Sequence, residues 1–364
     1  MPTISELGVE LSENKVINSR WKIEGKLGEG SCGAVYKVHD MQNPSMKAAL
    51  KVEANGEESV NVLKKEANVL KKLQTRPHTV RLVYSGRRET YSYVVMTLLG
   101  KSLSELRKQL EGGYMSASTA TRIGVHGLYA VKQLHEIGFV HRDIKPANMV
   151  TGRVGYQRRI VYLIDYGMAR NFAIWEEGKP RVRRCRDNVL LRGTIRFCSP
   201  TVHDRQEQGR RDDVWSFLYM LIELHVGLPW PGKPETEVGQ KKKDTGDVTL
   251  LEKCPKEWLD VMKHIRSLTY EARPNYRLIY DAFLATLTRM KVSFDDPYDW
   301  ETAEDVQQAK RSVSKSVSTS VKKKKQQNAE MSEVSTAKSV LGLPNPEAFP
   351  TTVAVEFDKN DIGC

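Results

Sequence analysis

Short runs of alternating or continuous apolar residues dominate the first hundred positions of the chain. Runs of this length and pattern are typical of β-strands. They read WKIEGKLG (21–28), AVYKVHD (34–40), KAALKVE (47–53), VRLVYSG (80–86) and YSYVVMTLL (91–99). The segment 59–73 differs, because its apolar residues recur at helical spacing and its lysines fall on the opposite face. The pattern therefore predicts a β-rich lobe over residues 20–97 with one amphipathic helix.

Beyond the β-rich lobe the pattern of apolar positions becomes mainly helical. In the segment 119–138 the apolar residues form one stripe, which ends at a glycine. The segment 212–227 is apolar nearly all round, which is typical of a helix buried inside a large domain. We therefore predict an α+β fold in which the β-rich lobe is followed by a larger, mostly helical lobe over residues 98–300.

The two ends of the chain have a different composition. Residues 1–19 are polar, and we predict that they form a loose arm. Residues 301–364 include the low-complexity run SVSKSVSTSVKKKKQQ (312–327), and sequence rich in Ser and Lys is typical of disorder. We therefore expect a disordered tail from about residue 302 onward.

The net charge of +12 comes entirely from residues 1–300, because residues 301–364 hold nine basic and nine acidic side chains. A basic folded domain favours anionic partners, which include nucleic acid, acidic or phosphorylated protein, and anionic lipid. We therefore expect an anionic partner to bind residues 1–300 rather than the tail.

The five cysteines are scattered along the chain and form no C-x-x-C pair. This spacing argues against a disulfide framework or a zinc site and favours a reducing compartment. The first 25 residues lack the pattern of a signal peptide, and no apolar run approaches the ~20 residues needed to cross a bilayer. We expect a soluble intracellular protein that does not associate with membranes.

Three glycines, Gly28, Gly30 and Gly33, have the G-x-G-x-x-G spacing of loops that bind phosphates. Alone the motif is weak, and an ordinary turn is the alternative. Here the motif lies between two predicted strands, whereas a dinucleotide-binding loop opens a helix. The arrangement therefore favours a hairpin lid over the phosphates of a nucleotide.

A lid of this kind requires a cation near the α- and β-phosphates and a carboxylate that orients the cation. Lys51 follows an apolar run on the next predicted strand, and Glu66 follows fifteen residues later in the predicted helix. Taken singly, each residue is more typical of a solvated surface charge. Whether the two residues form a functional pair therefore depends on the motifs that follow in the chain.

The segment FVHRDIKPANMV (139–150) carries the strongest signal. Asp143 stands five residues before Asn148, and Asp165 opens an Asp-Tyr-Gly triplet seventeen residues after Asn148. Phosphoryl transfer needs one carboxylate that orients and deprotonates the attacking hydroxyl, together with hard oxygen ligands for Mg²⁺. Asp143 fits the first requirement, and the other two residues fit the second.

In this order the motifs resemble those of the eukaryotic protein kinases over residues 20 to about 300. Lys145 is similar to the lysine that contacts the γ-phosphate in the serine/threonine-specific group. RGTIRFCSPTVHD (192–204) is similar to a stretch of the casein kinase 1 superfamily. The segments that most resemble the tau-tubulin kinase branch are VLKKEANVLKKLQ (62–74), YVVMTLLGKSLSELR (93–107), GFVHRDIKPAN (138–148) and RRDDVWSFLYMLIEL (210–224). The resemblance implies a bilobal protein-kinase fold and does not cover the tail.

The resemblance also implies that ATP and Mg²⁺ are the cofactors, and it assigns roles to individual residues. The implied catalytic residues are Lys51, Glu66, Asp143 and Lys145, and the implied metal ligands are Asn148 and Asp165. The implied ATP contacts are Leu27, Gly28, Glu29, Gly30, Ser31, Cys32, Gly33, Ala34, Val35, Ala49, Lys51, Met96, Leu98 and Val150. For Met96 and Val150, ordinary core packing is the alternative. Asp213 would hold the catalytic loop through hydrogen bonds.

The chain departs from the family pattern at two motifs. Tyr166 stands where the Asp-Phe-Gly triplet has Phe, and it keeps an aromatic ring while adding a hydroxyl, so activity is expected to persist. Ser199-Pro200-Thr201 replaces the Ser-Ile-Asn of the superfamily, which affects the local substrate groove rather than the chemistry. Cys32 is either an electrophile- or redox-sensitive thiol or an inert small residue, because reactivity depends on a lowered thiol pKa.

The segment that follows Asp165 is basic and has few phosphorylation sites. Up to Arg192 it holds no Ser, Thr or Tyr except Tyr166, so we expect no phosphorylation switch there. Thr194 is interpreted as a structural residue near Asp143. The segment is either a solvated basic face or an anion site for acidic or already phosphorylated substrates. The candidates for this anion site are Arg183, Arg184 and Arg196.

The preferred function is that of a serine/threonine protein kinase, expected to be monomeric, that acts on acidic or phosphorylated protein substrates. The alternatives are a catalytically silent kinase-fold scaffold and a nucleic-acid-binding protein. No zinc finger or aromatic RNA-binding signature accompanies the charge, so we expect no specific nucleic-acid partner. We expect a cytoplasmic location, with nuclear entry as an option if Lys322–Lys325 act as a signal. The serines Ser312 to Ser320 are candidate autophosphorylation sites.

Overall fold

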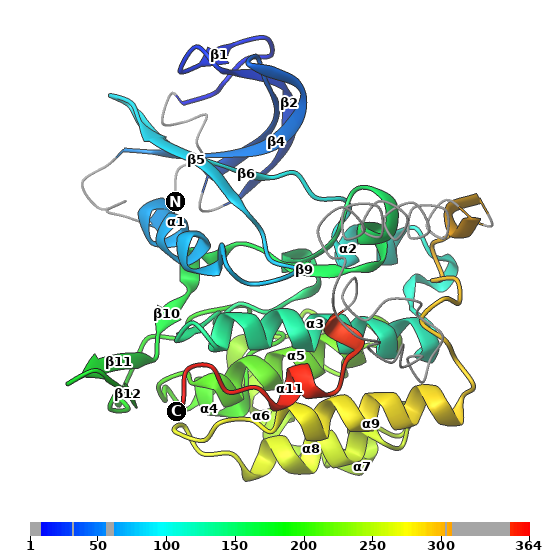
Figure 1. Ribbon diagram of the computed structural model, residues 1–364. Coiled ribbons are helices and arrows are strands. Elements are labelled where there is room, and N and C mark those ends of the chain that lie inside the picture. The colour runs from blue at the N-terminus through cyan, green and yellow to red at the C-terminus, as the bar shows by residue number, and fades with distance from the viewer. Residues whose placement is uncertain (1–8, 31–32, 56–61, 303, 308–349) are drawn as a thin grey trace, which may run out of the picture.

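The computed structural model describes residues 9–30, 33–55, 62–302, 304–307 and 350–364, which form two lobes (Figure 1). The smaller lobe is a six-stranded antiparallel sheet with the strand order β1-β2-β3-β4-β6-β5. Its strands are β1 (Val16–Ile17), β2 (Trp21–Gly30), β3 (Gly33–Asp40), β4 (Asn43–Ala54), β5 (Leu82–Arg87) and β6 (Tyr91–Thr97). Each predicted strand is present, and the predicted β-rich lobe is confirmed.

The predicted amphipathic helix is α1 (Val62–Leu73), which packs against β5 and β6. Its buried face consists of Leu63, Glu66, Ala67, Val69, Leu70 and Leu73. Five of these residues are apolar and Glu66 is charged, so this carboxylate enters the interior together with the apolar stripe. The helical periodicity thus places Glu66 on the face directed toward the rest of the protein, and the lysines between these positions stay outside.

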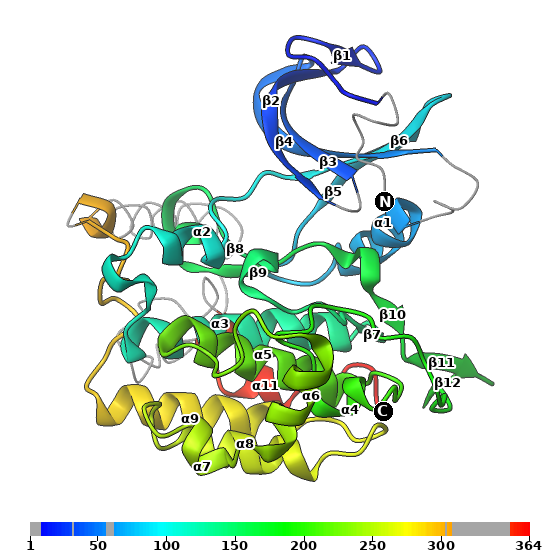
Figure 2. The same cartoon turned by 180° about the vertical axis from the view of Figure 1, so that it is seen from behind.

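The larger lobe is mostly helical, as predicted. Its helices are α2 (Leu103–Lys108), α3 (Ala117–His135), α4 (Pro200–His203), α5 (Arg210–His225), α6 (Glu235–Asp244), α7 (Asp247–Leu250), α8 (Trp258–Ser267), α9 (Tyr276–Arg289) and α11 (Val355–Asp358). α3 packs against both α5 and α9 at the centre of the lobe (Figures 1 and 2). After α3 the chain turns at Gly138, whose φ of +84° favours glycine. The two segments predicted to be helical therefore form the core of the lobe.

The described part of the larger lobe also contains three short antiparallel strand pairs. They are β7 (Phe139–Val140) with β10 (Arg170–Asn171), β8 (Met149–Thr151) with β9 (Val161–Leu163), and β11 (Ala173–Glu176) with β12 (Lys179–Val182). The first two pairs flank the segment 141–148, which contains the predicted catalytic motif. This segment is thus held at both of its ends by β-structure.

The structure corrects both predictions about the ends of the chain. Val9, Leu11 and Ile17 are buried in the core of the smaller lobe, so the part of the arm over residues 9–19 is packed rather than loose. Residues 350–364 are packed on the larger lobe, so the disorder predicted after residue 302 is wrong for this stretch. Few, widely spaced apolar residues carry both contacts, and such spacing has no period that a sequence pattern can reveal.

Within the described ranges, no helix combines the length and the apolar character needed to cross a membrane. The serines Ser312 to Ser320 and the lysines Lys322–Lys325 lie outside the described residues, so their predicted roles stay predictions.

Candidate active site

Asp143 lies in the loop between β7 and β8, where three side chains fix its carboxylate. Thr194 donates its hydroxyl to Oδ1 (2.6 Å), and the Lys145 ammonium contacts Oδ2 (2.6 Å). The Asn148 amide donates to the main-chain oxygen of Asp143 (2.9 Å) and more weakly to Oδ2 (3.2 Å). Asp143 itself is buried. The carboxylate is therefore held in one orientation by two residues of the loop and by Thr194 from a later segment, and Thr194 has the position predicted for it.

Asp213, near the start of α5, fixes the backbone of the same loop. Its carboxylate accepts hydrogen bonds from the main-chain N–H groups of His141 (2.6 Å) and Arg142 (2.8 Å) and lies 2.9 Å from Nε2 of His135. Burial raises the pKa of Asp213, but the hydrogen bond from His135 and the other donors outweigh burial and leave the pKa below its usual value. The role predicted for Asp213 matches these contacts.

Lys51 bridges the two lobes of the site. Its ammonium lies 2.7 Å from the carboxylate of Glu66 on α1 and 2.8 Å from the carboxylate of Asp165. Burial of Lys51 disfavours its charge, but the two carboxylates outweigh burial and raise the pKa of the ammonium. Burial alone would raise the pKa of the Asp165 carboxyl. The attraction of the Lys51 ammonium outweighs this effect of burial, so the pKa lies below its usual value. The surface-charge alternative for Lys51 and Glu66 is therefore wrong.

The aromatic ring of Tyr166 is buried below α1, next to the ring of His141 at a centroid distance of 5.6 Å. Its hydroxyl donates to the main-chain oxygen of Leu163 (2.7 Å), and its N–H donates to Glu66 (3.3 Å). A buried hydroxyl with a partner carries no large desolvation cost. The departure from Phe at this position is thus accommodated without displacing Asp165.

The strand registers explain which of the predicted ATP contacts face the cleft. Val35 on β3 is directly opposite Lys51 on β4, and Ala49 lies two residues earlier on the same face. Because successive strand residues point to opposite faces, Ala34 points away. Its side chain is fully buried in the core of the smaller lobe, so only the main chain of Ala34 is available for the predicted contact with ATP.

The remaining predicted ATP contacts lie around the same cleft. Met96 on β6 is paired with Ala49, Leu98 follows the end of β6, and Val150 is buried on β8 below. The glycine loop is the turn between β2 and β3, and Leu27 at its side is 53% exposed. An added Cβ at Gly28 or Gly30 would meet no atom within 4 Å, so this face of the loop is open. Ser31 and Cys32 lie outside the described residues.

The two predicted metal ligands present the oxygen chemistry that Mg²⁺ prefers. The side chain of Asp165 is 36% exposed, so its carboxylate contacts Lys51 and is still accessible from the cleft. Asp165 has a φ of +64°, and Asp tolerates this left-handed conformation better than bulky residues do. Asn148 uses its amide nitrogen toward Asp143, so the amide oxygen is the atom suited to a cation. The donor set therefore fits a divalent ion.

The basic segment after Asp165 splits into exposed and paired arginines. Arg183 and Arg184 are exposed. Arg196 instead contacts the buried carboxylate of Glu223 on α5 (2.9 Å), which also binds Arg107. The prediction of Arg196 as an anion contact therefore needs correction, because an internal carboxylate already pairs with its guanidinium.

Glu207 is a functional candidate that the sequence analysis missed. Its carboxylate is almost completely buried. It lies 2.5 Å from the guanidinium of Arg186 and 3.6 Å from that of Arg170. Arg142 of the catalytic loop is nearby, and burial followed by the repulsion from Arg170 lowers its pKa to about 10. Glu207 thus supplies negative charge to a cluster of three arginines that belong to the catalytic loop and to the segment after Asp165.

Two further side chains that sequence reasoning missed hold the segment 195–204. The buried ammonium of Lys242 donates to the main-chain oxygens of Ile195 and Cys198 (2.6 Å each). Asp212 accepts hydrogen bonds from Ser199 and from Thr201 (2.7 Å for Thr201), which explains how the Ser-Pro-Thr departure is accommodated. A run of lysines gives no sequence signal that one of them is internal.

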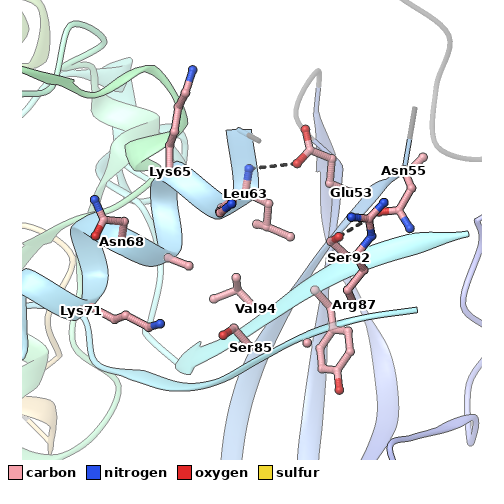
Figure 3. A pocket seen from close by; sticks show the side chains of 15 residues that line it. Glu53, Asn55, Leu63, Lys65, Asn68, Lys71, Ser85, Arg87, Ser92 and Val94 are labelled. Carbon is pink, nitrogen blue, oxygen red and sulfur yellow. Dashed lines mark hydrogen bonds between the residues drawn. The ribbon is translucent and has the colours of Figure 1, made fainter. Parts of the chain in front are cut away.

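A separate cavity of about 820 Å³ lies between α1 and the strands β4, β5 and β6 (Figure 3). At its rim, Glu53 accepts a hydrogen bond from the N–H of Leu63 at the start of α1 (2.9 Å). In Figure 3 Lys71 extends from α1 toward Ser85 and Val94 on the strands. None of the residues that line this cavity is a predicted ATP contact, so it is distinct from the cleft around Lys51.

Comparison with known proteins agrees with this geometry. A model of the protein kinase domain matches residues 21–283. A Caenorhabditis elegans protein named as a serine/threonine-protein kinase is 39% identical over 81% of this chain and 86% of its own length. An inactive tau-tubulin kinase of the same organism, ttbk-6, is 35% identical over 66% and 87%. Casein kinase I homolog 3 of Schizosaccharomyces pombe is 33% identical over 79% and 67%.

Proposed function

The chain belongs to the protein kinase family, in the casein kinase I superfamily with affinity to the tau-tubulin kinases, and from this premise we propose that it is catalytically active. Its reaction is transfer of the γ-phosphate of ATP to serine or threonine hydroxyls of protein substrates. The observation that carries the proposal is the contact of Lys51 with both Glu66 and Asp165 (2.7 and 2.8 Å). Phosphoryl transfer in protein kinases requires the ion pair between the lysine and the glutamate, together with an aspartate in position to bind Mg²⁺.

The chain's own residues support each part of the reaction. Asp143 accepts the proton of the attacking hydroxyl, and the hydrogen bond from Thr194 fixes its direction. Lys145 lies beside Asp143 and supplies positive charge toward the transferring phosphoryl group. Lys51 orients the α- and β-phosphates. Mg²⁺, held by Asn148 and Asp165, would neutralise the charge of the phosphates.

A catalytically silent scaffold is the competing function, and one relative is named an inactive kinase. In this chain Tyr166 is packed under α1 and Asp165 contacts Lys51, so the change from Phe to Tyr removes no catalytic group. Activity is therefore the better-supported function, and a measurement of phosphate transfer from ATP/Mg²⁺ to a protein substrate separates the two.

We also propose that the substrates are acidic or already phosphorylated proteins. The support is the exposed basic side chains of Arg183 and Arg184 in the segment that follows Asp165, since guanidinium groups form strong, charge-assisted hydrogen bonds with phosphate.

The first prediction tests this anion site. In the variant Arg183→Ala/Arg184→Ala, we expect KM for a phospho-primed acidic peptide to rise about tenfold, equal to about 1.4 kcal/mol. KM for the unprimed peptide should change much less, and added salt should reduce the preference of the wild type, because exposed charges are screened. Lys263→Ala removes an exposed cation on α8 and serves as the control. Equal KM changes for the two peptides would refute a site for phosphate.

The second prediction concerns Glu207, which we infer to replace the phosphate that orders this segment in other kinases. Glu207→Gln removes the negative charge between Arg142, Arg170 and Arg186, so these cations repel one another and the segment loses its arrangement. We expect kcat to fall about tenfold with KM for ATP unchanged. The control is Glu176→Gln, which alters an exposed ion pair with Arg181 in the same segment. An unchanged kcat for Glu207→Gln would show that the arrangement does not depend on this charge.

A further inference from the structure

Residues 350–364 lie outside the range that matches the kinase domain, yet they cross the larger lobe over α3 and α9, on the side that faces the viewer in Figure 1. We call this stretch the C-terminal clasp; it contains the short turn η5 (Pro350–Thr352) and α11. We propose that the clasp is a docking segment that binds its own kinase domain in cis, in a groove built by α3 and α9. By binding there it positions the turn that leads into the catalytic loop.

The apolar anchor of α11 is Phe357, which is completely buried. Its ring stacks on Tyr280 of α9 at a centroid distance of 4.4 Å and meets the edge of Tyr129 of α3 at 5.8 Å. An aromatic side chain enclosed by two aromatic side chains is typical of the centre of a specific interface. The neighbouring Val355 is 56% exposed, so α11 directs one particular side chain into the groove.

The groove also pairs with polar groups of the clasp. The hydroxyl of the fully buried Thr351 lies 2.8 Å from Nδ1 of His126 on α3. The hydroxyl of Tyr280 donates to the main-chain oxygen of Thr352 (2.7 Å). His126 and Tyr280 thus supply partners at the depth where an unpaired polar group of the clasp would be costly. The groove therefore offers hydrogen-bond partners to particular groups of the clasp, in addition to an apolar site for Phe357.

Charge complementarity extends along the clasp. Its side chains from Glu356 onward include three carboxylates and one lysine. Arg277 of α9 contacts Asp358 (2.8 Å), and Arg76, after α1, contacts Asp361. Arg273, before α9, donates to the main-chain oxygen of Lys359 (2.6 Å). Arginines from separate parts of the chain thus converge on one acidic segment, and such complementarity fixes the register of an interface.

Glu136 connects the clasp to the end of α3. This buried carboxylate accepts hydrogen bonds from the main-chain N–H groups of Asp361 (2.6 Å) and Ile362 (3.3 Å). Its other oxygen contacts Lys132 (3.2 Å) and Arg273 (3.0 Å). Without the clasp, Glu136 would lose two of its donors, and a buried carboxylate that lacks donors is strongly destabilising.

The final residues of the clasp reach the segment that carries the catalytic loop. Ile362 packs with Val140 of β7 and with Phe172 and Ala173, which follow β10. A Cβ at Gly138 would lie 3.3 Å from the side chain of Ile362, so the turn before β7 is in close contact with the clasp. β7 runs directly into the loop of Asp143, and β10 follows the Asp165 triplet. The clasp therefore packs against the segments that lead into the catalytic loop and out of the Asp165 triplet.

Two full-length variants test the proposal. Phe357→Ala should lower Tm by about 4–8 °C, because it empties an enclosed aromatic site, whereas the matched variant Val355→Ala should leave Tm unchanged. At a temperature where both variants are folded, Phe357→Ala should reduce kcat about threefold to tenfold with KM for ATP unchanged. Phe357→Tyr should recover most of both quantities, because the ring is kept. A loss of Tm with an unchanged kcat would overturn the positioning role.

A synthetic peptide with the sequence of residues 350–364 provides a readout that does not require catalysis. Added in trans to the Phe357→Ala variant, it should raise Tm toward the wild-type value, because a ligand of the folded state stabilises it. The same peptide with Ala in place of Phe357 should have no effect. If neither peptide changes Tm, the groove does not recognise the clasp as a ligand, whatever the outcome of the activity assay.

A charge-reversal cycle at the ion pair of Arg76 with Asp361 tests the role of the clasp without changing a buried apolar side chain. Arg76→Asp and Asp361→Arg should each reduce kcat and Tm, because each leaves like charges in contact. The double variant Arg76→Asp/Asp361→Arg should recover part of both losses. If the two single effects are simply additive in the double variant, this contact does not hold the clasp.

Discussion

Asp143→Asn is expected to lower kcat for phosphate transfer by about 10²- to 10⁴-fold, the usual contribution of a general base. Asn has the same shape as Asp and keeps an acceptor for the hydroxyl of Thr194, but it cannot take the proton of the substrate hydroxyl. Binding of ATP and Mg²⁺ should persist, since Asp143 is not among the implied ATP contacts. The measurement is transfer from ATP/Mg²⁺ to casein and to a phospho-primed acidic peptide.

The matched control is Asp260→Asn, which removes an exposed carboxylate on α8 and should leave kcat unchanged. Thermal unfolding with and without ATP/Mg²⁺ reports nucleotide binding in each variant. If the wild type binds ATP and transfers nothing to either substrate, the scaffold function replaces the proposed one. The residues to revert would then be Tyr166 and Pro200, where the chain departs from the family pattern.

Lys51→Met is expected to lower kcat/KM by about 10²- to 10³-fold and also to destabilise the fold by about 3 kcal/mol. Activity falls because the cation that orients the phosphates is absent. Stability falls because Glu66, with a side chain only 2% exposed, keeps a buried charge without the ammonium that lies 2.7 Å away. Steady-state kinetics and denaturant unfolding measure the two effects separately.

The double variant Lys51→Met/Glu66→Gln distinguishes the two causes. Replacing Glu66 by Gln removes the unpaired buried charge, so most of the lost stability should return. Catalysis should not return, because Asp165 still lacks the cation 2.8 Å away that holds it in the site. Recovery of activity in the double variant would show that Lys51 acts only through the stability of the fold.

The sequence predicted much of the architecture because strands and helices leave local patterns. The alternation over residues 34–40 and 47–53 corresponds to β3 and β4, and the helical spacing over residues 59–73 corresponds to α1. The predicted pairing of Lys51 with Glu66 was also within reach, since a motif with fixed spacing identified both residues. Local periodicity and motif spacing are thus the parts of the fold that a single sequence can express.

The sequence did not show which charged side chains pair with one another, because the partners lie far apart in the chain. Arg196 and Arg183 look alike in a basic stretch, but only the fold places Glu223 beside Arg196. Glu207 follows the same rule, because its arginine partners lie in a different segment. In the same way, nothing in a sequence shows which lysine of the run 241–243 becomes buried.

The two ends of the chain show most clearly what only the tertiary structure decided. By itself, the sequence determined that this is a two-lobed kinase with a polar arm and a tail of low complexity. It could not reveal that Phe357, in an acidic stretch with little periodicity, binds between Tyr129 and Tyr280. An isolated apolar residue is stabilised only by a groove, and this groove is assembled from residues of α3 and α9 that are far apart in the chain. The partner surface exists only once the lobe has folded, so the pattern around Phe357 contains no record of it.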